Sequence, residues 1–213
     1  MNGELLRYKK HKRIVFDTET CHLNLYPKHN FPWSLAYAIV EDEKVVKESE
    51  SYIWKEDLKI SKEAAQITRF NFNEYKVKAR PANEVYEEFA KYYYDPEYLI
   101  VGTNTYFDWH MVRCLEDYLG IKNNTDLNDR IYCTHALFKG LKLNLTPPKN
   151  KEDFVLFQFN LLNFVRKGLK SGIKASAEHF GIYYDPMVHH NALADVKYSN
   201  QIFNQLLWKM EIY

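Results

Sequence analysis

Four carboxylates and one histidine in this chain are of the residue types that bind divalent cations and transfer protons. They occur in three segments far apart in the sequence, and they are Asp17 and Glu19, then Asp108, then His190 and Asp195. Carboxylate oxygens are the ligands that Mg2+ prefers, and a histidine exchanges its proton near neutral pH. A set of this kind is typical of two-metal hydrolysis of a phosphodiester bond.

The first two carboxylates follow an apolar run. The segment RIVFDTET, whose apolar residues end at Phe16, has the pattern of a buried strand. Because side chains alternate along a strand, Asp17 and Glu19 lie on one face, and both can bind the same cation. Solvated acidic pairs are also common at strand ends. This pair alone therefore does not separate a metal site from an ordinary surface.

Asp108 belongs to a segment with helical spacing. In TYFDWHMVRCLEDYLG the apolar positions fall three, four, seven and eleven residues after this aspartate, at Met111, Val112, Leu115 and Leu119. The spacing places Asp108 on the helix face that packs into the core. The segment also allows a second interpretation, in which Thr105 or Asp108 caps the helix.

Asp195 has a similar position in the last helix, three residues after Ala192 and one before Val196, at the edge of an apolar stripe. A buried carboxylate needs a partner, and a divalent cation is a strong one. Asn191 is a good N-cap residue, which would leave His190 outside the helix and able to reach the cations. An ordinary surface histidine is the alternative for His190.

These segments require a mixed α/β scaffold in which the first three strands are consecutive and antiparallel. The predicted strands lie at 13–19, 34–40, 45–54, 99–102 and within 131–137. Helices are predicted at 82–94, at 105–119 with its end at Gly120, within 161–182, and at 190–210. Residues 141–153, which contain Pro-Pro and several charges, are predicted to form a loop.

Length and composition favour one domain over residues 1–213, with 46% hydrophobic and 16% aromatic residues to build a core. A net charge of +1 excludes a broad basic surface, so contact with nucleic acid is expected in a groove. No apolar run approaches the ~20 residues that span a bilayer, and no signal peptide is evident, so no membrane contact is expected.

The three cysteines are far apart and form no CxxC, which disfavours a disulfide framework and fits a reducing cytoplasm. Neither the histidines at 179, 189 and 190 nor Cys133 with His135 has the four-ligand spacing of structural zinc. The Tyr-, Asn- and Lys-rich composition fits an AT-rich, viral genome, and in that case the location would be the host cytoplasm.

Together the three motifs resemble those of the DnaQ-like DEDDh family of 3′–5′ exonucleases, in the ribonuclease H-like superfamily. The matching segments are FDTET, N-x-x-F-D from Asn104 to Asp108, and H-x-x-x-x-D from His190 to Asp195. The sister subfamily has tyrosine at the position of Asn191, so the histidine type is indicated. The resemblance implies a ribonuclease H-like mixed sheet flanked by helices.

The resemblance also implies a role for each motif residue. Two divalent cations, Mg2+ or Mn2+, would be held by the family's four carboxylates, here Asp17, Glu19, Asp108 and Asp195. His190 would be the general base for the attacking water. The substrate-binding positions would be Thr20, Leu23, Asn104 and Phe107. The substrate would be a nucleic acid with a free 3′ end, in particular single-stranded DNA, cut to nucleoside 5′-monophosphates. RNA as substrate, or a noncatalytic nucleic-acid-binding accessory subunit, are the alternatives.

Some segments depart from the family pattern. Residues 21–34 form a longer connection than in compact members, 141–160 are inserted, and TRFNF near Thr68 replaces a Gly-Ile-Thr turn. Bases of a single strand need aromatic platforms, for which the candidates are Tyr106, Phe107, Phe31, Trp33 and Tyr184. For Phe107, packing in the core is favoured over stacking on a base.

Overall fold

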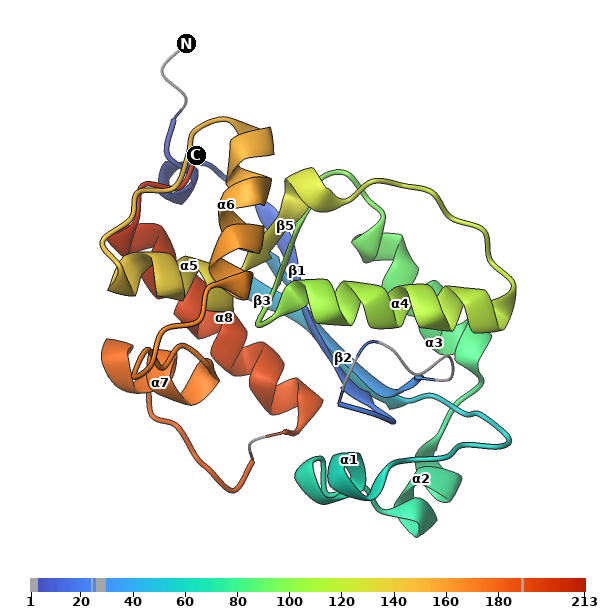
Figure 1. Ribbon diagram of the computed structural model, residues 1–213. Coiled ribbons are helices and arrows are strands. Elements are labelled where there is room, and N and C mark those ends of the chain that lie inside the picture. The colour runs from blue at the N-terminus through green and yellow to red at the C-terminus, as the bar shows by residue number, and fades with distance from the viewer. Residues whose placement is uncertain (1–3, 24, 26–29, 189) are drawn as a thin grey trace.

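The computed structural model describes residues 4–23, 25, 30–188 and 190–213. Within this part of the chain, a five-stranded sheet has the order β3-β2-β1-β4-β5 (Figure 1). Its strands are β1 (Lys12–Thr20), β2 (Pro32–Glu41), β3 (Lys44–Tyr52), β4 (Tyr98–Gly102) and β5 (Ile131–Cys133). Strands β1 to β3 are antiparallel, whereas β1, β4 and β5 are parallel. The predicted mixed sheet, with its first three strands antiparallel, is confirmed.

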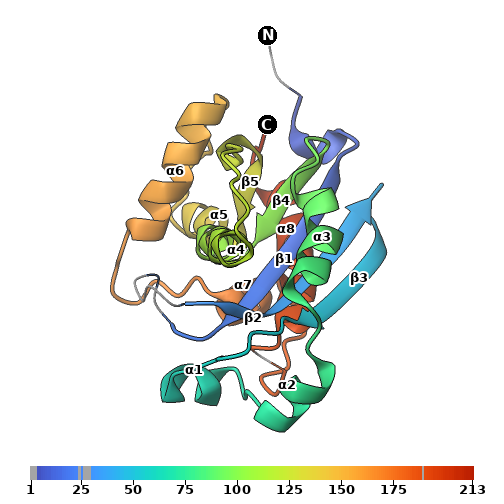
Figure 2. The same ribbon diagram turned by 90° about the vertical axis from the view of Figure 1, so that its right-hand side faces the viewer.

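The longer helices that pack around this sheet are α3 (Ala82–Tyr93), α4 (Thr105–Leu119), α5 (Thr134–Lys142), α6 (Lys151–Asn163) and α8 (Ala192–Lys209). Figure 2 shows the sheet between α3 in front and α8 behind. In the described part of the chain, no helix is both long enough and apolar enough to cross a bilayer.

Strand β1 is buried on both faces, as its central place in the sheet requires. Phe16 points to the face covered by α3, where its ring lies 5.4 Å from that of Phe89. Val15 points to the opposite face, into the apolar cluster that includes Val196 and Phe203 of α8. The alternation of side chains along the strand therefore fixes which helix each residue contacts.

The region from 131 to 182 corrects the sequence prediction. The strand ends at Cys133 and a helix follows at once, so the predicted loop at 141–153 is reduced to 143–150. Helix α6 starts after the Pro-Pro pair because the Asn150 side chain accepts a hydrogen bond from the Asp153 amide at 3.2 Å. The stretch predicted as helical at 161–182 contains only the end of α6 and the short helix α7 (Ile173–Phe180).

Two short helices that the sequence did not predict, α1 (Lys62–Ile67) and α2 (Phe72–Lys78), lie between β3 and α3. Both are opened by side-chain caps, since Ser61 accepts from the Ala64 amide at 3.1 Å and Asn71 accepts from the Glu74 amide at 3.1 Å. Figure 1 places these helices at one end of the sheet, the end that also contains the start of α8.

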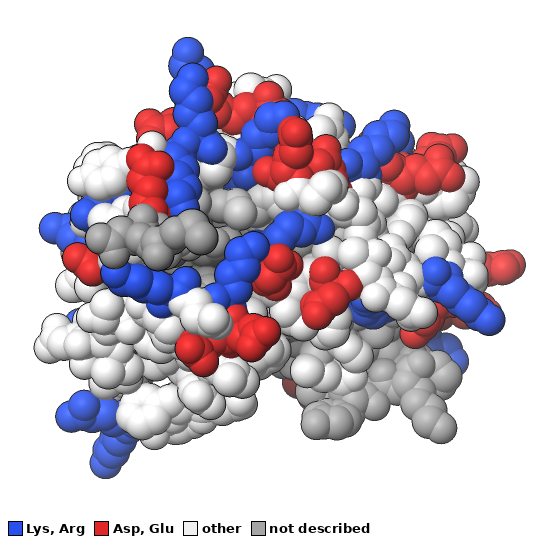
Figure 3. Space-filling model, turned by 90° about the horizontal axis from the view of Figure 1, so that it is seen from above, with Lys and Arg blue, Asp and Glu red and all other residues white. Residues whose placement is uncertain are grey.

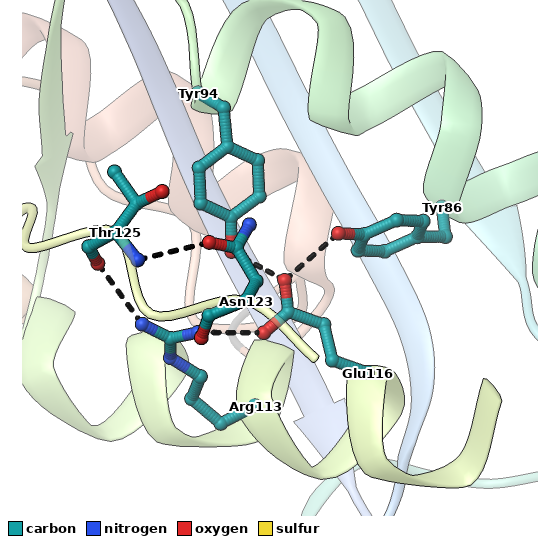
Figure 4. A network of polar contacts seen from close by, with 6 residues as sticks. All are labelled: Tyr86, Tyr94, Arg113, Glu116, Asn123 and Thr125. Carbon is teal, nitrogen blue, oxygen red and sulfur yellow. Dashed lines mark hydrogen bonds and ion pairs between the residues drawn. The ribbon is translucent and has the colours of Figure 1, made fainter. Parts of the chain in front are cut away.

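A buried carboxylate on α4 joins three parts of the fold (Figure 4). Glu116 accepts hydrogen bonds from the hydroxyls of Tyr86, at 2.8 Å, and of Tyr94. Its second oxygen lies 3.1 Å from Arg113, which also donates to the Thr125 carbonyl at 3.0 Å. Every partner of this carboxylate is a donor supplied by the protein, so the network ties α3, α4 and the following loop together.

Candidate active site

Three of the carboxylates meet at the end of strand β1. Asp17 and Glu19 lie two residues apart on this strand and therefore on the same face, as the sequence predicted. Asp195 lies in the first turn of α8, the helix that packs on this face. One oxygen from each of the three side chains lies within 4.8 Å of the other two.

Asp108 reaches this end of β1 from α4. Its Oδ1 atom accepts two hydrogen bonds from Thr18, one from the amide at 3.0 Å and one from the hydroxyl at 2.7 Å. The N-cap position of α4 belongs to Asn104, four residues earlier. Asp108 is therefore one turn inside the helix and tied to β1, which disagrees with the interpretation in which it serves as the helix cap.

Burial makes the charged forms of these acids costly. It raises the pKa of Asp17 well above its ordinary value, and the neighbouring carboxylates of Asp108 and Asp195 raise it further. The pKa of Glu19 is raised in the same way. Burial raises the pKa of Asp108 to about 7, although the hydrogen bonds from Thr18 act in the opposite direction. Nearby positive charge would stabilise the ionised cluster.

A divalent cation fits this donor set. The ligand atoms are all carboxylate oxygens, which Mg2+ and Mn2+ prefer over softer ligands such as thiolates. The oxygens of Asp17, Glu19 and Asp195 are close enough to share one ion, and Asp108 lines the same cleft. The raised pKa values of Asp17, Glu19 and Asp108 indicate that the protein itself compensates the charge of these three carboxylates only in part.

His190 lies immediately before α8. Its backbone has φ 61°, in the left-handed region, and Asn191 occupies the N-cap position with its Oδ1 atom accepting from the Ala194 amide at 2.9 Å. The Asn191 side chain also donates to Glu50 of β3 at 3.0 Å. Asn191 thus joins the sheet to α8 next to the histidine. The predicted position of His190, outside the helix, is confirmed, and His189 falls outside the described residues.

A cleft of about 460 Å³ contains all five residues of the predicted set. Of the predicted substrate-binding residues, Leu23, Asn104 and Phe107 also line it. Thr20 does not line the cleft, because it is buried and its hydroxyl donates to the His22 carbonyl at 2.7 Å.

The aromatic candidates divide into two groups. Phe31 and Trp33 are buried in the core, and Tyr106 is buried against Phe159, so these three rings do not present a face to the cleft. Phe107 is half-buried and lines the cleft, contrary to the expectation that it packs in the core. Tyr184 is half-buried and packs against Tyr198, with the ring centres 5.1 Å apart.

The sequence did not identify seven further residues that line the cleft, namely Thr18, Ile67, Thr68, Thr103, Gly172, Ile173 and Lys174. Ile67 ends α1, a helix that was not predicted. For Lys174 a signal was present in the sequence, because this residue ends a cluster of basic residues that begins at Arg166. It lay outside the three motifs and was therefore overlooked.

A family model of exonucleases, RNase_T, matches residues 14–203. The chain belongs to this exonuclease family. The matched range contains all three motifs and every strand of the sheet except the first residues of β1. The predicted resemblance to DnaQ-like exonucleases is thereby confirmed. No curated protein matches the sequence.

Solved structures of E. coli exonuclease I have the same fold. The complex with a dT13 oligonucleotide superposes with a TM-score of 0.71 at 15% identity, over 92% of this chain and 41% of that one. The zinc-bound form in complex with single-stranded DNA gives 0.70 at 15% identity, over 92% and 40%. The chain therefore spans about two fifths of the length of these relatives. The ribonuclease H-like architecture is confirmed by these matches.

Proposed function

We propose that the chain is a 3′–5′ exonuclease that depends on divalent cations and releases nucleoside 5′-monophosphates from single-stranded DNA. The observation that carries the proposal is the convergence of Asp17, Glu19 and Asp195 within 4.8 Å, in one cleft with Asp108 and His190. Such a group of inward-facing acids is costly to a protein that only binds nucleic acid.

The carboxylates would hold the cations. Asp17, Glu19 and Asp195 would supply ligand atoms to a first ion, and Asp108, which lines the same cleft, would hold a second. When bound, such ions supply Lewis acidity to the scissile phosphate and offset the negative charge of the cluster. Thr18 fixes the orientation of Asp108 through two hydrogen bonds to one oxygen.

His190 would accept the proton of the attacking water. The water oxygen bonds to phosphorus, the bond from phosphorus to the 3′ oxygen breaks, and that oxygen takes a proton from solvent. Imidazole suits this task because its pKa is close to neutral pH. The Asn191 side chain donates a hydrogen bond to Glu50, and Asn191 directly follows His190. Glu50 would therefore be a positioning residue for His190.

The terminal nucleotide would lie between apolar groups of the cleft. Leu23 and Phe107 line it, and Leu23 is 52% exposed, so its side chain is available to a base. Asn104 would contribute a polar contact from the start of α4. Stacking of one base on an aromatic ring contributes about 1–3 kcal/mol.

Single-stranded DNA is the substrate that we infer, with RNA as the alternative. The near-neutral chain lacks the charge to coat a duplex. The E. coli exonuclease I structures that share the fold contain single-stranded DNA. A cytoplasmic location stays a prediction from the sequence.

The proposal is tested with 5′-labelled DNA and RNA oligonucleotides of 20 nucleotides, in the presence of Mg2+ or Mn2+. We expect a ladder that shortens from the 3′ end, faster on DNA, and no ladder in EDTA. His190→Ala should reduce kcat by a factor on the order of 10² to 10⁴, whereas His189→Ala, the matched control, should not. Absence of shortening by the wild type would reject catalysis, and faster shortening of RNA would reverse the substrate assignment.

A further inference from the structure

Three basic side chains lie on the connection between α6 and α7, and a fourth lies in the first turn of α7. They belong to residues 164–174, here called the basic segment, which contains no Asp or Glu, and they are Arg166, Lys167, Lys170 and Lys174. All four are exposed. The whole chain has 29 basic and 28 acidic residues, so this segment is a local excess of positive charge. By contrast, the end of the molecule that carries the C-terminus intersperses basic and acidic side chains (Figure 3).

The basic segment leads into the active-site cleft. Its last residues, Gly172, Ile173 and Lys174, line the cleft that contains the carboxylates. In Figure 1 the segment descends from α6 to α7, which lies beside the lower part of α8. Lys174 makes a long contact with Glu178, at 4.0 Å between exposed side chains. Among the described residues, Arg166, Lys167 and Lys170 form no ion pair.

Both ends of the basic segment are fixed by helix α5. At one end, buried Lys139 donates hydrogen bonds of 3.0, 3.2 and 3.1 Å to the carbonyl oxygens of Leu161, Leu162 and Phe164. At the other end, the Ser171 hydroxyl lies 2.8 Å from the His135 ring. The backbone that carries the cations is therefore held in place before any ligand binds, which reduces the entropy cost of binding.

Exposed apolar side chains accompany the charges. Phe164 is 40% exposed and Val165 90% exposed at the start of the segment. Phe159 of α6 is also partly exposed, and its ring lies 4.2 Å from that of Tyr106. Cations beside exposed apolar and aromatic groups match the two parts of a single nucleic-acid strand, its phosphates and its bases.

We propose that the basic segment binds the phosphates of the substrate strand on the 5′ side of the nucleotide held in the cleft. The inference rests on the proposed function and adds to it a path for the strand outside the active site. It explains how a chain of nearly balanced charge would hold a polyanion, since the positive charge is concentrated where the strand would leave the cleft.

The test replaces three cations that lie outside the cleft, in the variant Arg166→Gln/Lys167→Gln/Lys170→Gln. A matched control, Lys9→Gln/Lys10→Gln/Lys44→Gln, removes three exposed positive charges near the opposite end of β1. Binding of a labelled 20-residue oligonucleotide is measured by fluorescence anisotropy in EDTA over a range of salt, so the result does not depend on turnover. Cleavage of the same oligonucleotide is compared with cleavage of a dinucleotide, which occupies the cleft alone.

We expect the segment variant to bind the 20-residue strand about tenfold more weakly, with a salt slope smaller by about 2, since each phosphate contact in a single strand adds ~0.7. Its kcat/KM on the dinucleotide should equal that of the wild type. Unchanged affinity and salt slope, the same loss in the control, or an equal loss on the dinucleotide would each overturn the inference. If the wild type shortens no oligonucleotide, the proposed function fails. The anisotropy measurement would still show whether the basic segment binds the strand.

Discussion

Helix α4 carries two buried carboxylates with opposite surroundings. Asp108 is 3% exposed and Glu116 is 1% exposed. Glu116 is surrounded by two tyrosine hydroxyls and Arg113, so the protein itself compensates its charge. Asp108 has Thr18 as a donor but faces the acids of β1 and α8, and its pKa is raised to about 7. Burial alone therefore does not mark a functional acid. The identity of the neighbouring groups does.

The largest expected difference between the two carboxylates is in catalysis. Asp108→Asn keeps the size of the side chain and removes the charge that a cation needs. We expect kcat to fall on the order of a thousandfold, equivalent to several kcal/mol of transition-state stabilisation. Cleavage rates at saturating Mg2+ measure the effect, with urea unfolding as the check on folding. An Asp108→Asn enzyme with wild-type kcat would remove Asp108 from the site.

Glu116→Ala should have the opposite effect, a loss of stability with little loss of catalytic rate. It leaves Arg113 and two tyrosine hydroxyls without their carboxylate, and removing one partner of a buried ion pair costs about 3 kcal/mol or more. We expect the free energy of unfolding in urea to fall by that amount, while kcat of the folded fraction at low temperature is retained. The comparison would break down if this variant lost activity without losing stability.

The surroundings of Asp108 and of Glu116 should also differ in how pH and cations affect the stability of the protein. Because the pKa of Asp108 is raised from 3.8 to about 7, the folded state binds more protons than the unfolded state between about pH 4 and 7. Stability without cations should therefore fall as pH rises through that range. Mg2+ at ten times its Kd should restore about 1.4 kcal/mol at pH 8 and almost nothing at pH 5. Urea unfolding in EDTA and in Mg2+ measures this.

In the Asp108→Asn variant, stability without cations should fall less steeply as pH rises, because the contribution of this carboxyl group is removed. Glu116→Gln offers a control, because it should leave the response to Mg2+ as it is in the wild type. A cation effect of equal size at both pH values would contradict the assignment of these carboxylates as ligands.

Glu50 differs from both of these acids, since it is exposed and accepts a hydrogen bond from the side-chain amide of Asn191. Loss of one such bond costs about 1 kcal/mol. We expect Glu50→Ala to lower kcat roughly fivefold with little change in KM, because only the placement of His190 is affected. Glu50→Gln, which can still accept the bond, should recover most of the rate. A KM effect instead would make Glu50 a substrate contact.

Sequence periodicity was enough to predict that Asp108 and Asp195 face inward. A helical stripe shows which face of a helix is buried, and both acids lie on such a stripe. Periodicity could not distinguish Asp108 from Glu116, which is buried two turns later on the same helix. The partners of Glu116 include Tyr86 on α3 and Tyr94 directly after it, and contacts between elements leave no regular spacing in the sequence.

The errors in the sequence prediction also have local causes. Helix α6 was hidden by the Pro-Pro pair before it, although Asn150 was available as its cap. Phe107 was assigned to the core because most aromatic residues next to an apolar stripe pack inward. In the structure it borders the cleft, since the space beside it is left open at the end of β1. The basic segment was missed because charged surface residues are common and only its position beside the cleft gives it meaning.

The cluster of carboxylates combines the first strand of the sheet with the last helix, because Asp17 and Asp195 share it. During synthesis on a ribosome, a chain that has not yet reached residue 195 lacks one of its four acids and the helix that presents it. Cleavage would therefore begin only after nearly the whole matched domain has left the ribosome. The order of the motifs along the chain would therefore keep a partly made nuclease inactive toward any nucleic acid nearby.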